Sequence, residues 1–454
     1  MNAQRLSRIG WMMVFAMVAG APFASAQDSN YWSSAFGTRS QLLGGVVIGS
    51  PGDISAVYYN PGAFALAQAS EVLLAGSAYQ YQKVSIDNGS GPGRSLSTSS
   101  LDAVPSLFAG ELRILPEDRL AYAFLTRRSM DMQIQRRSTT GFDELAPIVN
   151  PIFAAGSIDI TQNFNEGWYG MTWAHKLTPT LGVGVSPFLV VRSQHTRAAF
   201  FAEGMNGAGE AAVVSASRDF DFMHWGLLAR VGLSGVRDSL TWGLTVTTPS
   251  LGITGSGNTA YNATLIDQTG TIGNIIGADY EKERKVEYRT PVGAGAGASY
   301  GWGATRVHAA VDWNGEISKY TVIESEPFTV TTPAGDSTVQ VVINDRLDAV
   351  LNWGVGLEHH FSPYLGGYLS YHTDQSGRNE RDEIGASLTR WDLKHVAAGA
   401  TWHVWRSDIA IGFNAAFGSQ NTPVPPAPPE TPAAPQLKTH ELLLTGILGW
   451  KVSF

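Results

Sequence analysis

The sequence predicts an all-β fold, a transmembrane antiparallel β-barrel of about fourteen strands, and three observations support this prediction. Segments along most of the chain alternate large apolar residues with small or polar ones. The connections between these segments are short and long in turn. The chain also begins with the pattern of a secretory leader and finishes on an aromatic residue.

The alternating segments have one apolar face and one face of small or polar residues. In the stretch 240–247, Leu240, Trp242 and Leu244 share a face, and threonine or glycine occupies the other. Successive side chains of a strand point to opposite faces, so this period indicates a strand. An apolar exterior around a small or polar interior is typical of a barrel in lipid. The segments lie at 71–86, 101–115, 120–136, 158–177, 181–200, 212–235, 240–255, 283–302, 305–323, 346–361, 364–375, 390–405, 408–418 and 440–454.

The connections alternate in length, which is typical of bacterial outer-membrane barrels with short periplasmic turns and long outer loops. We therefore expect the outer membrane of a Gram-negative bacterium, with both termini on the periplasmic side. The short turns are expected at 116–119, 178–180, 236–239, 303–304, 362–363 and 406–407. The long loops are expected at 87–100, 137–157, 201–211, 256–282, 324–345, 376–389 and 419–439.

Both ends of the chain fit export to that membrane. Arg5 and Arg8 precede an apolar run at 9–19, and small residues at 24 and 26 form a cleavage site, so residues 1–26 are expected to be a signal peptide. The last strand ends at Phe454, and an aromatic end to an alternating strand is expected to be recognised by the barrel-insertion machinery. The domain division is then 1–26 signal peptide, 27–69 lumen segment and 70–454 barrel.

Composition excludes several functions. Lys and Arg total 31 against 39 for Asp and Glu, and a formal charge of -8 gives no attraction for nucleic acid. Cysteine is absent, which removes thiolate metal sites, cysteine nucleophiles and a lipid-attachment cysteine. No cofactor is expected. Membrane lipid and lipopolysaccharide are the expected surroundings of the apolar exterior.

Residues 27–69 do not alternate, and we expect them to form a hatch that plugs the lumen. A barrel of about fourteen strands is wider than the eight-strand kind that its own side chains can fill. Small inward residues such as Gly293, Gly295 and Gly297 leave room for a plug to pack against the wall.

Part of this segment resembles a known family. Residues 44–49 read GGVVIG, residues 53–62 read DISAVYYNPG and residues 63–66 read AFAL. Over roughly 34–75 this is similar to the hatch of the FadL-type long-chain fatty acid transporters, which carries an acidic residue and then an aromatic-Asn-Pro-Ala turn. The matching residues are Asp53, Tyr59, Asn60, Pro61 and Gly62, with Gly62 where alanine is usual.

The resemblance implies passive uptake of hydrophobic molecules, either long-chain fatty acids or aromatic hydrocarbons. Family members collect them on apolar outer loops, pass them to a pocket against the hatch and release them sideways at a kinked third strand. The segment 120–136 contains neither glycine nor proline, so no kink is expected there, whereas Pro105 and Gly110 interrupt the second strand.

Candidate ligand-binding residues fall into two groups. Arg192 and Arg230 occupy the inward phase of neighbouring strands, where either could pair with a ligand carboxylate or with an acid of the barrel. An apolar cluster in the loop after the third strand is a candidate contact surface, formed by Leu145, Ile148, Val149, Ile152 and Phe153.

No metal site is expected. His359 and His360 are adjacent in a strand and therefore point to opposite faces, and His224 is isolated in the sequence.

Three other functions remain open on the same architecture: a surface anchor or secretion partner without transport, a general porin, and an outer-membrane hydrolase. No nucleophile elbow or spaced metal motif favours the hydrolase.

Overall fold

The computed structural model describes residues 29–50, 52–67, 71–87, 95–112, 118–139, 149–378, 391–422 and 437–453. The expected signal peptide, Leu145, Ile148, Phe454 and the proline-rich stretch 423–435 lie outside these residues. Within the described part of the chain, no helix has both the length and the hydropathy needed to cross a membrane.

Short helices precede a long series of strands. The helices are α2 (Thr38–Leu42), α3 (Ala56–Tyr59) and α4 (Pro61–Ala65). The strands are β1 (Glu71–Ile86), β2 (Leu96–Leu112), β3 (Asp118–Ser138), β4 (Phe153–Thr178), β5 (Leu181–Met205), β6 (Ala211–Arg237), β7 (Leu240–Thr247), β8 (Leu251–Asp267), β9 (Ile275–Lys285), β10 (Gly293–Trp302), β11 (Thr305–Asn314), β12 (Ile317–Glu324), β13 (Phe328–Thr332), β14 (Gly335–Val339), β15 (Val342–Leu347), β16 (Val350–Ser362), β17 (Leu365–Asp374), β18 (Leu393–Val404), β19 (Ser407–Thr422) and β20 (Leu437–Ser453).

Eighteen of these strands form one antiparallel sheet, closed into a barrel whose wall the chain crosses 14 times, and β12 and β15 pair with each other in a separate two-stranded sheet. The ring closes where β1 pairs with β20, from Glu71 opposite Ser453 to Ile86 opposite Thr439. Four passes are each made of two strands in succession, namely β7 with β8, β9 with β10, β11 with β12 and β15 with β16. The predicted fold class and strand number are confirmed.

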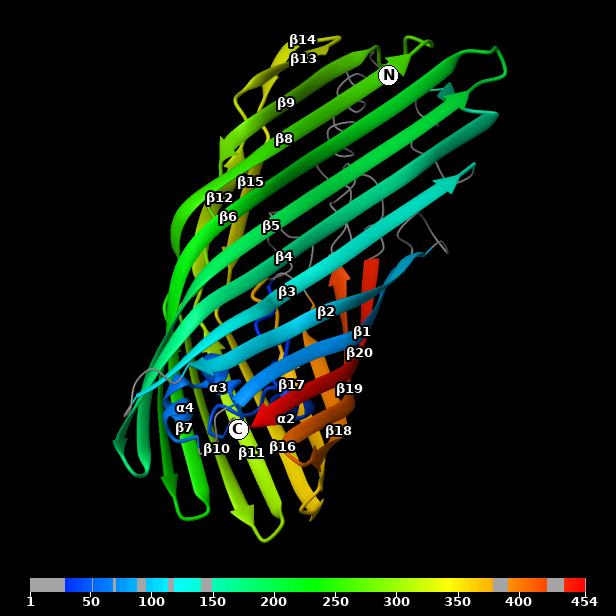
Figure 1. Ribbon diagram of the computed structural model, residues 1–454. Helices are drawn as coiled ribbons and strands as arrows, with labels where there is room; N and C mark the ends of the chain where they lie inside the picture. The colour runs from blue at the N-terminus through cyan, green and yellow to red at the C-terminus, as the bar shows by residue number, and fades with distance from the viewer. Residues whose placement is uncertain are drawn as a thin grey trace.

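The two ends of the barrel differ. One end has two-residue turns at 179–180, 238–239, 303–304, 363–364 and 405–406. β1 begins and β20 ends at this end, as the pairing of Glu71 with Ser453 requires. At the other end the connections are longer, and the strongly tilted wall from β3 to β9 rises far above β17 to β20 (Figure 1). We call this the tall end.

The wall has the predicted alternation. In β6, Met223, Trp225 and Leu227 are exposed on the outer face, whereas His224 and Leu228 are buried. Large aromatic side chains gather outside near the two-residue turns, as in the girdles of membrane barrels. They are Trp173, Tyr300, Trp302, Phe361, Tyr364, Trp402 and Trp405.

Several segments expected to be loops are strands instead. β8 continues to Asp267 and β9 begins at Ile275, so most of the loop expected at 256–282 is part of the wall. The loop expected at 201–211 shrinks to 206–210 for the same reason. Higher on the wall the pattern of polarity reverses: in β6, Val214 is buried inside while Ser215 and Ser217 lie on the outer phase. Alternation with an apolar outer face therefore marks only the part of each strand that lies within the apolar band.

Candidate functional site

Residues 29–50 and 52–67 lie in the lumen, with α2, α3 and α4 near the two-residue turns, and we call them the hatch (Figure 1). Its apolar side chains, among them Phe36, Leu42 and Phe64, pack in one cluster with the wall residues Leu107 and Phe188. All five are at most 1% exposed. Full burial of one such side chain contributes roughly 1.5–3 kcal/mol, so this packing holds the hatch firmly.

The Asn60 side chain joins three parts of the structure. Its oxygen accepts the backbone N–H of Gly62 at 3.1 Å and caps α4, and Pro61 fits the first turn of that helix because it lacks the N–H. Its nitrogen donates to the carbonyls of Ile48 at 3.0 Å and Leu233 at 3.1 Å. Leu233 belongs to β6, so Asn60 fastens the hatch to the wall.

Glycines of the wall let the hatch motif approach. A Cβ atom added at Gly62 would lie 2.6 Å from the Gly232 carbonyl oxygen and 2.7 Å from that of Gly182. A Cβ at Gly184 would lie 2.5 Å from the Pro61 oxygen. Alanine does not fit at position 62 in this arrangement, which explains the departure from the family pattern. We call Gly182, Gly184, Gly232 and Gly243 the glycine cradle.

A second contact of this kind involves the glycine run of β10. A Cβ at Gly297 would lie 2.8 Å from the backbone nitrogen of Gly49, and one at Gly295 would lie 2.8 Å from the Ile48 side chain. The contact predicted between the hatch and this run is present.

Asp53 and Tyr59 act within the hatch. The Asp53 carboxylate accepts the backbone N–H of Ser55 at 2.9 Å and the hydroxyl of Thr38 at 3.3 Å, which ties α2 to the turn before α3. The Tyr59 hydroxyl accepts the backbone N–H of Phe36 at 2.8 Å. Burial raises the pKa of Tyr59, so the phenol stays neutral at physiological pH.

A buried ion pair fastens α2 to β16. Arg39 Nη2 lies 2.6 Å from Glu358 Oε2, and Arg39 Nε lies 3.1 Å from both carboxylate oxygens. The side chains are 14% and 6% exposed. Burial opposes the charge on Arg39, but the Glu358 carboxylate outweighs it and holds the pKa of Arg39 above its ordinary value.

The first described residues of the hatch are fastened by Asp374 at the end of β17. Its carboxylate accepts the backbone N–H groups of Tyr31 at 2.9 Å and Trp32 at 2.8 Å, and the hydroxyl of Ser33 at 2.6 Å. Asn30 donates to the Asp374 carbonyl at 2.7 Å. We call residues 29–35 the strap.

An aspartate at position 60 is expected to destabilise the protein by roughly 2–4 kcal/mol, because Asn60→Asp keeps the cap but leaves two buried carbonyls facing a carboxylate. The midpoint of urea unfolding measures this loss. The matched variant Asn206→Asp changes a partly exposed turn residue whose oxygen accepts two backbone N–H groups and whose nitrogen donates to Glu210 at 2.8 Å, and it should cost less than about 1 kcal/mol. Equal losses in both variants would show that Asn60 is no special fastening point.

The two predicted arginines have different surroundings. Arg192 is fully buried, with Nη1 3.3 Å from Glu166, Nη2 2.7 Å from Gln194 and its guanidinium over the Tyr288 ring at 4.2 Å. It therefore pairs with an acid of the wall. Arg230 donates to the Tyr58 carbonyl at 2.6 Å and lies over the ring of Tyr58, so it links wall and hatch.

Arg230 also lines a cavity above the hatch, which we call the arginine pocket. Four guanidinium and two carboxylate side chains line it beside aromatic rings. Its lining residues are Tyr31, Arg127, Arg128, Glu166, Trp168, Leu228, Arg230, Thr247, Tyr288, Arg289, Thr290, Pro291, Asp312, Asn314 and Leu347.

Arg127 and Arg128 were missed at the sequence level because adjacent strand residues normally face opposite ways. A bulge in β3 between Thr126 and Arg128 sends both inward, and they are 6% and 7% exposed. Arg127 donates to the Tyr31 carbonyl and Arg128 lies over the Tyr31 ring at 4.8 Å. No kink was expected in the third strand; β3 runs unbroken from Asp118 to Ser138, but it carries this bulge. Such a bulge requires neither glycine nor proline.

The wall opens beside this bulge. β2 and β3 pair from Leu112 opposite Leu120 only as far as Leu107 opposite Leu125, and above that point β3 continues on β4 alone among the described pairings. Pro105 lies two residues beyond the last pair and has no N–H to donate. We call this parting of β2 and β3 the seam.

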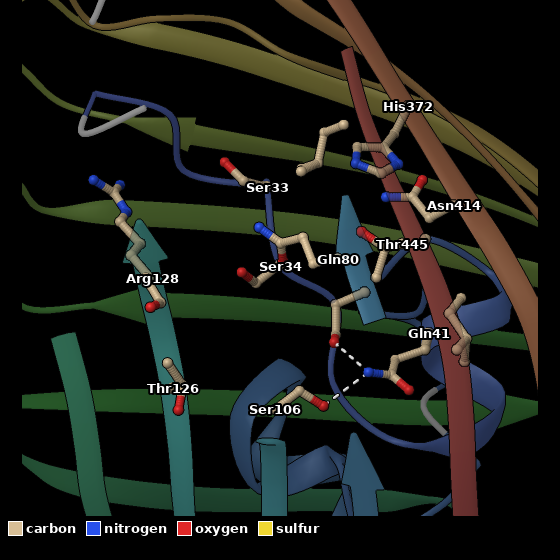
Figure 2. A pocket seen from close by; sticks show the side chains of 15 residues that line it. Ser33, Ser34, Gln41, Gln80, Ser106, Thr126, Arg128, His372, Asn414 and Thr445 are labelled. Carbon is tan, nitrogen blue, oxygen red and sulfur yellow. Dashed lines mark hydrogen bonds between the residues drawn. The ribbon is translucent and has the colours of Figure 1, made fainter. Parts of the chain in front are cut away.

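A second cavity, the seam pocket, lies between the strap and the wall at the seam (Figure 2). Most of its lining is polar and uncharged. The lining residues are Ser33, Ser34, Ala35, Gln41, Gly44, Gln80, Ser106, Thr126, Arg128, Ser129, His372, Asn414, Leu443, Thr445 and Ile447.

The apolar candidates after β3 lie at the tall end. Val149 is 2% exposed and packs inside, whereas Ile152 and Phe153 are 75% and 52% exposed. Phe153 pairs with Met205 of β5, which is also exposed. Val149 therefore belongs to the packed interior, whereas Ile152 and Phe153 form an exposed apolar edge at the tall end.

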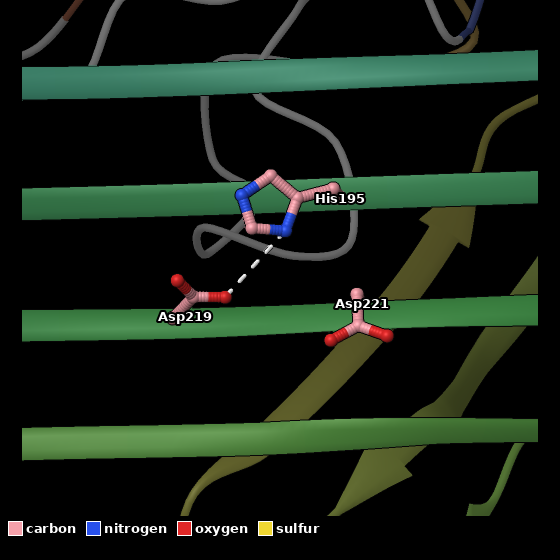
Figure 3. Close-up of side chains that lie close together, drawn as sticks. All are labelled: His195, Asp219 and Asp221. Atoms are coloured by element: carbon pink, nitrogen blue, oxygen red, sulfur yellow. Dashed lines mark ion pairs between the residues drawn. The ribbon is translucent and has the colours of Figure 1, made fainter.

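The histidines considered for metal binding have other partners. His359 Nδ1 lies 2.8 Å from the Thr305 hydroxyl and His360 Nε2 lies 3.1 Å from Glu358. On the outer phase of β5 and β6, ligating atoms of His195, Asp219 and Asp221 lie within 4.8 Å of one another (Figure 3). These side chains are partly exposed, and we assign them no role.

Comparison with known proteins shows similarity at the level of structure. No protein-family model matches the sequence, and no curated protein matches it by sequence. The toluene transporter TodX of P. putida has a TM-score of 0.59 at 13% identity, covering 92% of this chain and 99% of that one. For the toluene transporter TbuX of Ralstonia pickettii the TM-score is 0.55 at 12% identity, covering 92% and 98%.

A FadL homologue from Pseudomonas aeruginosa has a TM-score of 0.57 at 12% identity and covers 94% of this chain and 100% of that one. Coverage is near complete in each of these three comparisons. The chain therefore has the fold of the FadL-type hydrocarbon transporters, the fold family that its hatch sequence resembles.

Proposed function

We propose that this protein is an outer-membrane transporter for the passive uptake of hydrophobic molecules, either long-chain fatty acids or aromatic hydrocarbons. One observation carries the proposal: apolar side chains form packed clusters inside the barrel from the tall end down to the arginine pocket, and we call these clusters the apolar lining. An apolar solute gains nothing from a water-filled channel and needs a continuous apolar surface to cross a polar layer.

The lining has two parts that meet. Near the tall end, Val149, Leu265 and Val330 belong to one cluster. Below it, Phe222 and Ile323 belong to a second cluster. Tyr261 and Phe328 pack against both clusters, with their ring centroids 5.2 Å apart. The two packed clusters are therefore in contact through these rings.

The lining then reaches the arginine pocket. Tyr31, Tyr288 and Leu347 belong to the second cluster and also line that pocket. Trp168 and Leu228 line the pocket and belong to the core around the hatch. A molecule that follows this surface arrives above the hatch, which occupies the lumen below.

We further propose that molecules leave through the seam. The hatch fills the straight path down the lumen, and β2 and β3 part beside both pockets. In the orientation that we propose, with the tall end outside the cell, the two-residue turns and both termini face the periplasm. Lipopolysaccharide surrounds the outer part of the wall, and the barrel-insertion machinery recognises the last strand. The names of the structural neighbours, two of them toluene transporters and one a FadL homologue, support the same class of cargo.

Proteoliposomes test the proposal. Purified barrel should accelerate uptake of a labelled long-chain fatty acid or an alkylbenzene over protein-free liposomes. Ile323→Asn buries a polar amide in the second cluster and should slow uptake roughly tenfold, because an amide without a hydrogen-bond partner disrupts the apolar packing along the proposed route. Thr321→Asn, an exposed change on the same strand, should leave the rate unchanged. Equal uptake with and without protein rejects transport.

A further inference from the structure

The seam pocket differs from the rest of the proposed route because its wall is polar. Serine, threonine, glutamine and asparagine side chains dominate its lining, and Arg128 is its one lining residue with a permanent charge. Arg128 also lines the arginine pocket, so the two cavities adjoin. Its apolar lining residues are Ala35, Leu443 and Ile447. A hydrocarbon alone does not match this wall.

Gln41 contributes an acceptor without a partner. Its nitrogen donates to the Ala35 carbonyl at 3.0 Å and to the Ser106 hydroxyl at 2.8 Å, which fixes the orientation of the amide. Figure 2 shows both bonds on the nitrogen and neither on the oxygen. Gln41 is 2% exposed, and its oxygen has no hydrogen-bond partner among the described residues.

His372 contributes a second acceptor. Its Nε2 lies 3.1 Å from the Trp32 carbonyl, which can only accept, so Nε2 carries the proton. In the neutral ring Nδ1 then has a free lone pair. His372 is 2% exposed, and its Nδ1 has no partner within the described part of the chain.

Asn414 contributes a third acceptor. Its nitrogen lies 3.3 Å from Nδ1 of His395 and donates to it, which turns the amide oxygen the other way. That oxygen is buried and unpaired in the described structure. Gln41 and His372 have committed their donors, Asn414 uses one of its two N–H groups, and all three leave an acceptor.

A set of unpaired buried acceptors calls for a ligand that donates hydrogen bonds. The acceptors repel a carboxylate, and the guanidinium of Arg128 disfavours an ammonium group. A neutral hydroxyl satisfies both conditions, and the apolar lining residues can contact the body that carries it. We propose that the seam pocket binds the hydroxyl group of hydrophobic alcohols or phenols, so that the protein prefers such molecules to the corresponding hydrocarbons. This inference rests on the proposed transport function.

Two probes that differ only in a hydroxyl group test the inference: 4-butylphenol and butylbenzene, titrated into the full-length barrel in detergent. The wild-type protein should bind the phenol about tenfold more tightly, because the hydrocarbon leaves buried acceptors unpaired. The same preference should appear in the rate of uptake by proteoliposomes.

Two variants remove acceptors from different elements. Gln41→Met changes the hatch and Asn414→Leu changes β19, and each should lower phenol affinity at least threefold while butylbenzene affinity stays constant. Gln133→Met, the same change at an exposed position of β3, should alter neither. Circular dichroism and thermal unfolding verify that each variant is folded.

The outcomes are distinguishable. If both probes bind with equal affinity and neither variant changes it, the pocket holds only water. This result overturns the inference but leaves the proposed transport function intact. Preference for the phenol that persists in both variants also overturns it, because the preference then arises elsewhere. If the barrel accelerates the uptake of neither probe and does not accelerate the uptake of a fatty acid either, the transport function itself is rejected.

Discussion

A valine at position 232 is expected to displace the hatch and open the lumen to ions. Any Cβ at Gly232 meets the Asn60 side chain and would lie 2.8 Å from Pro61, and the wall behind it is a continuous strand that cannot retreat. Overpacking of this kind costs about 3 kcal/mol. Single-channel conductance in planar bilayers should rise from near zero to that of a water-filled barrel, and the midpoint of urea unfolding should fall.

The matched control is Gly207→Val, because a Cβ at Gly207 has nothing within 4 Å. It should conduct like the wild type. Wild-type conductance in the Gly232→Val barrel would mean that the hatch does not depend on the glycine cradle. A high conductance of the unmodified barrel would instead favour a general porin over a transporter for hydrophobic molecules.

Removal of the Glu358 carboxylate is expected to produce the second large effect. Glu358→Ala removes the carboxylate that balances the charge of the Arg39 guanidinium, whose side chain is 14% exposed. Breaking a buried ion pair from one side costs about 3–5 kcal/mol, because the remaining charge stays desolvated. The urea midpoint should fall by that amount, and protease cleavage within the hatch should become faster.

A double variant separates charge from packing. Arg39→Met combined with Glu358→Met removes both charges and should recover more than half of the lost stability. Asp348→Ala, which breaks the exposed pair with Arg346 at 2.9 Å, should cost less than about 1 kcal/mol. If the double variant recovers none of the lost stability, the pair contributes through the packing of its side chains and not through their charges.

The wall was predictable because lipid imposes a simple rule on it. Met223, Trp225 and Leu227 are exposed to the outside and the residues between them are buried, so the period of two is visible in the sequence. The rule fails above the apolar band, where Val214 faces inward and Ser215 outward. That failure explains why strands there were expected to be loops.

The candidate site was predictable only where its contacts join residues that are close together in the sequence. The aromatic-Asn-Pro turn was recognisable in the sequence, and in the structure Asn60 caps α4 while Pro61 occupies its first turn. Arg127 gave no signal, because its inward direction depends on a bulge defined by pairing with β4. The partner of Arg192 is Glu166 on the neighbouring strand, a pairing that depends on register. Contacts between distant segments are fixed by the fold and not by spacing along the chain.

The strap has a consequence for biogenesis. Tyr31 and Trp32 leave the ribosome early, yet the carboxylate that receives their N–H groups belongs to Asp374, 343 and 342 positions later. Closing so long a loop is entropically costly and slow, so these bonds form late in folding. The residues of the strap are therefore expected to gain hydrogen-exchange protection after the neighbouring wall, so that assembly of the barrel precedes the docking of the strap.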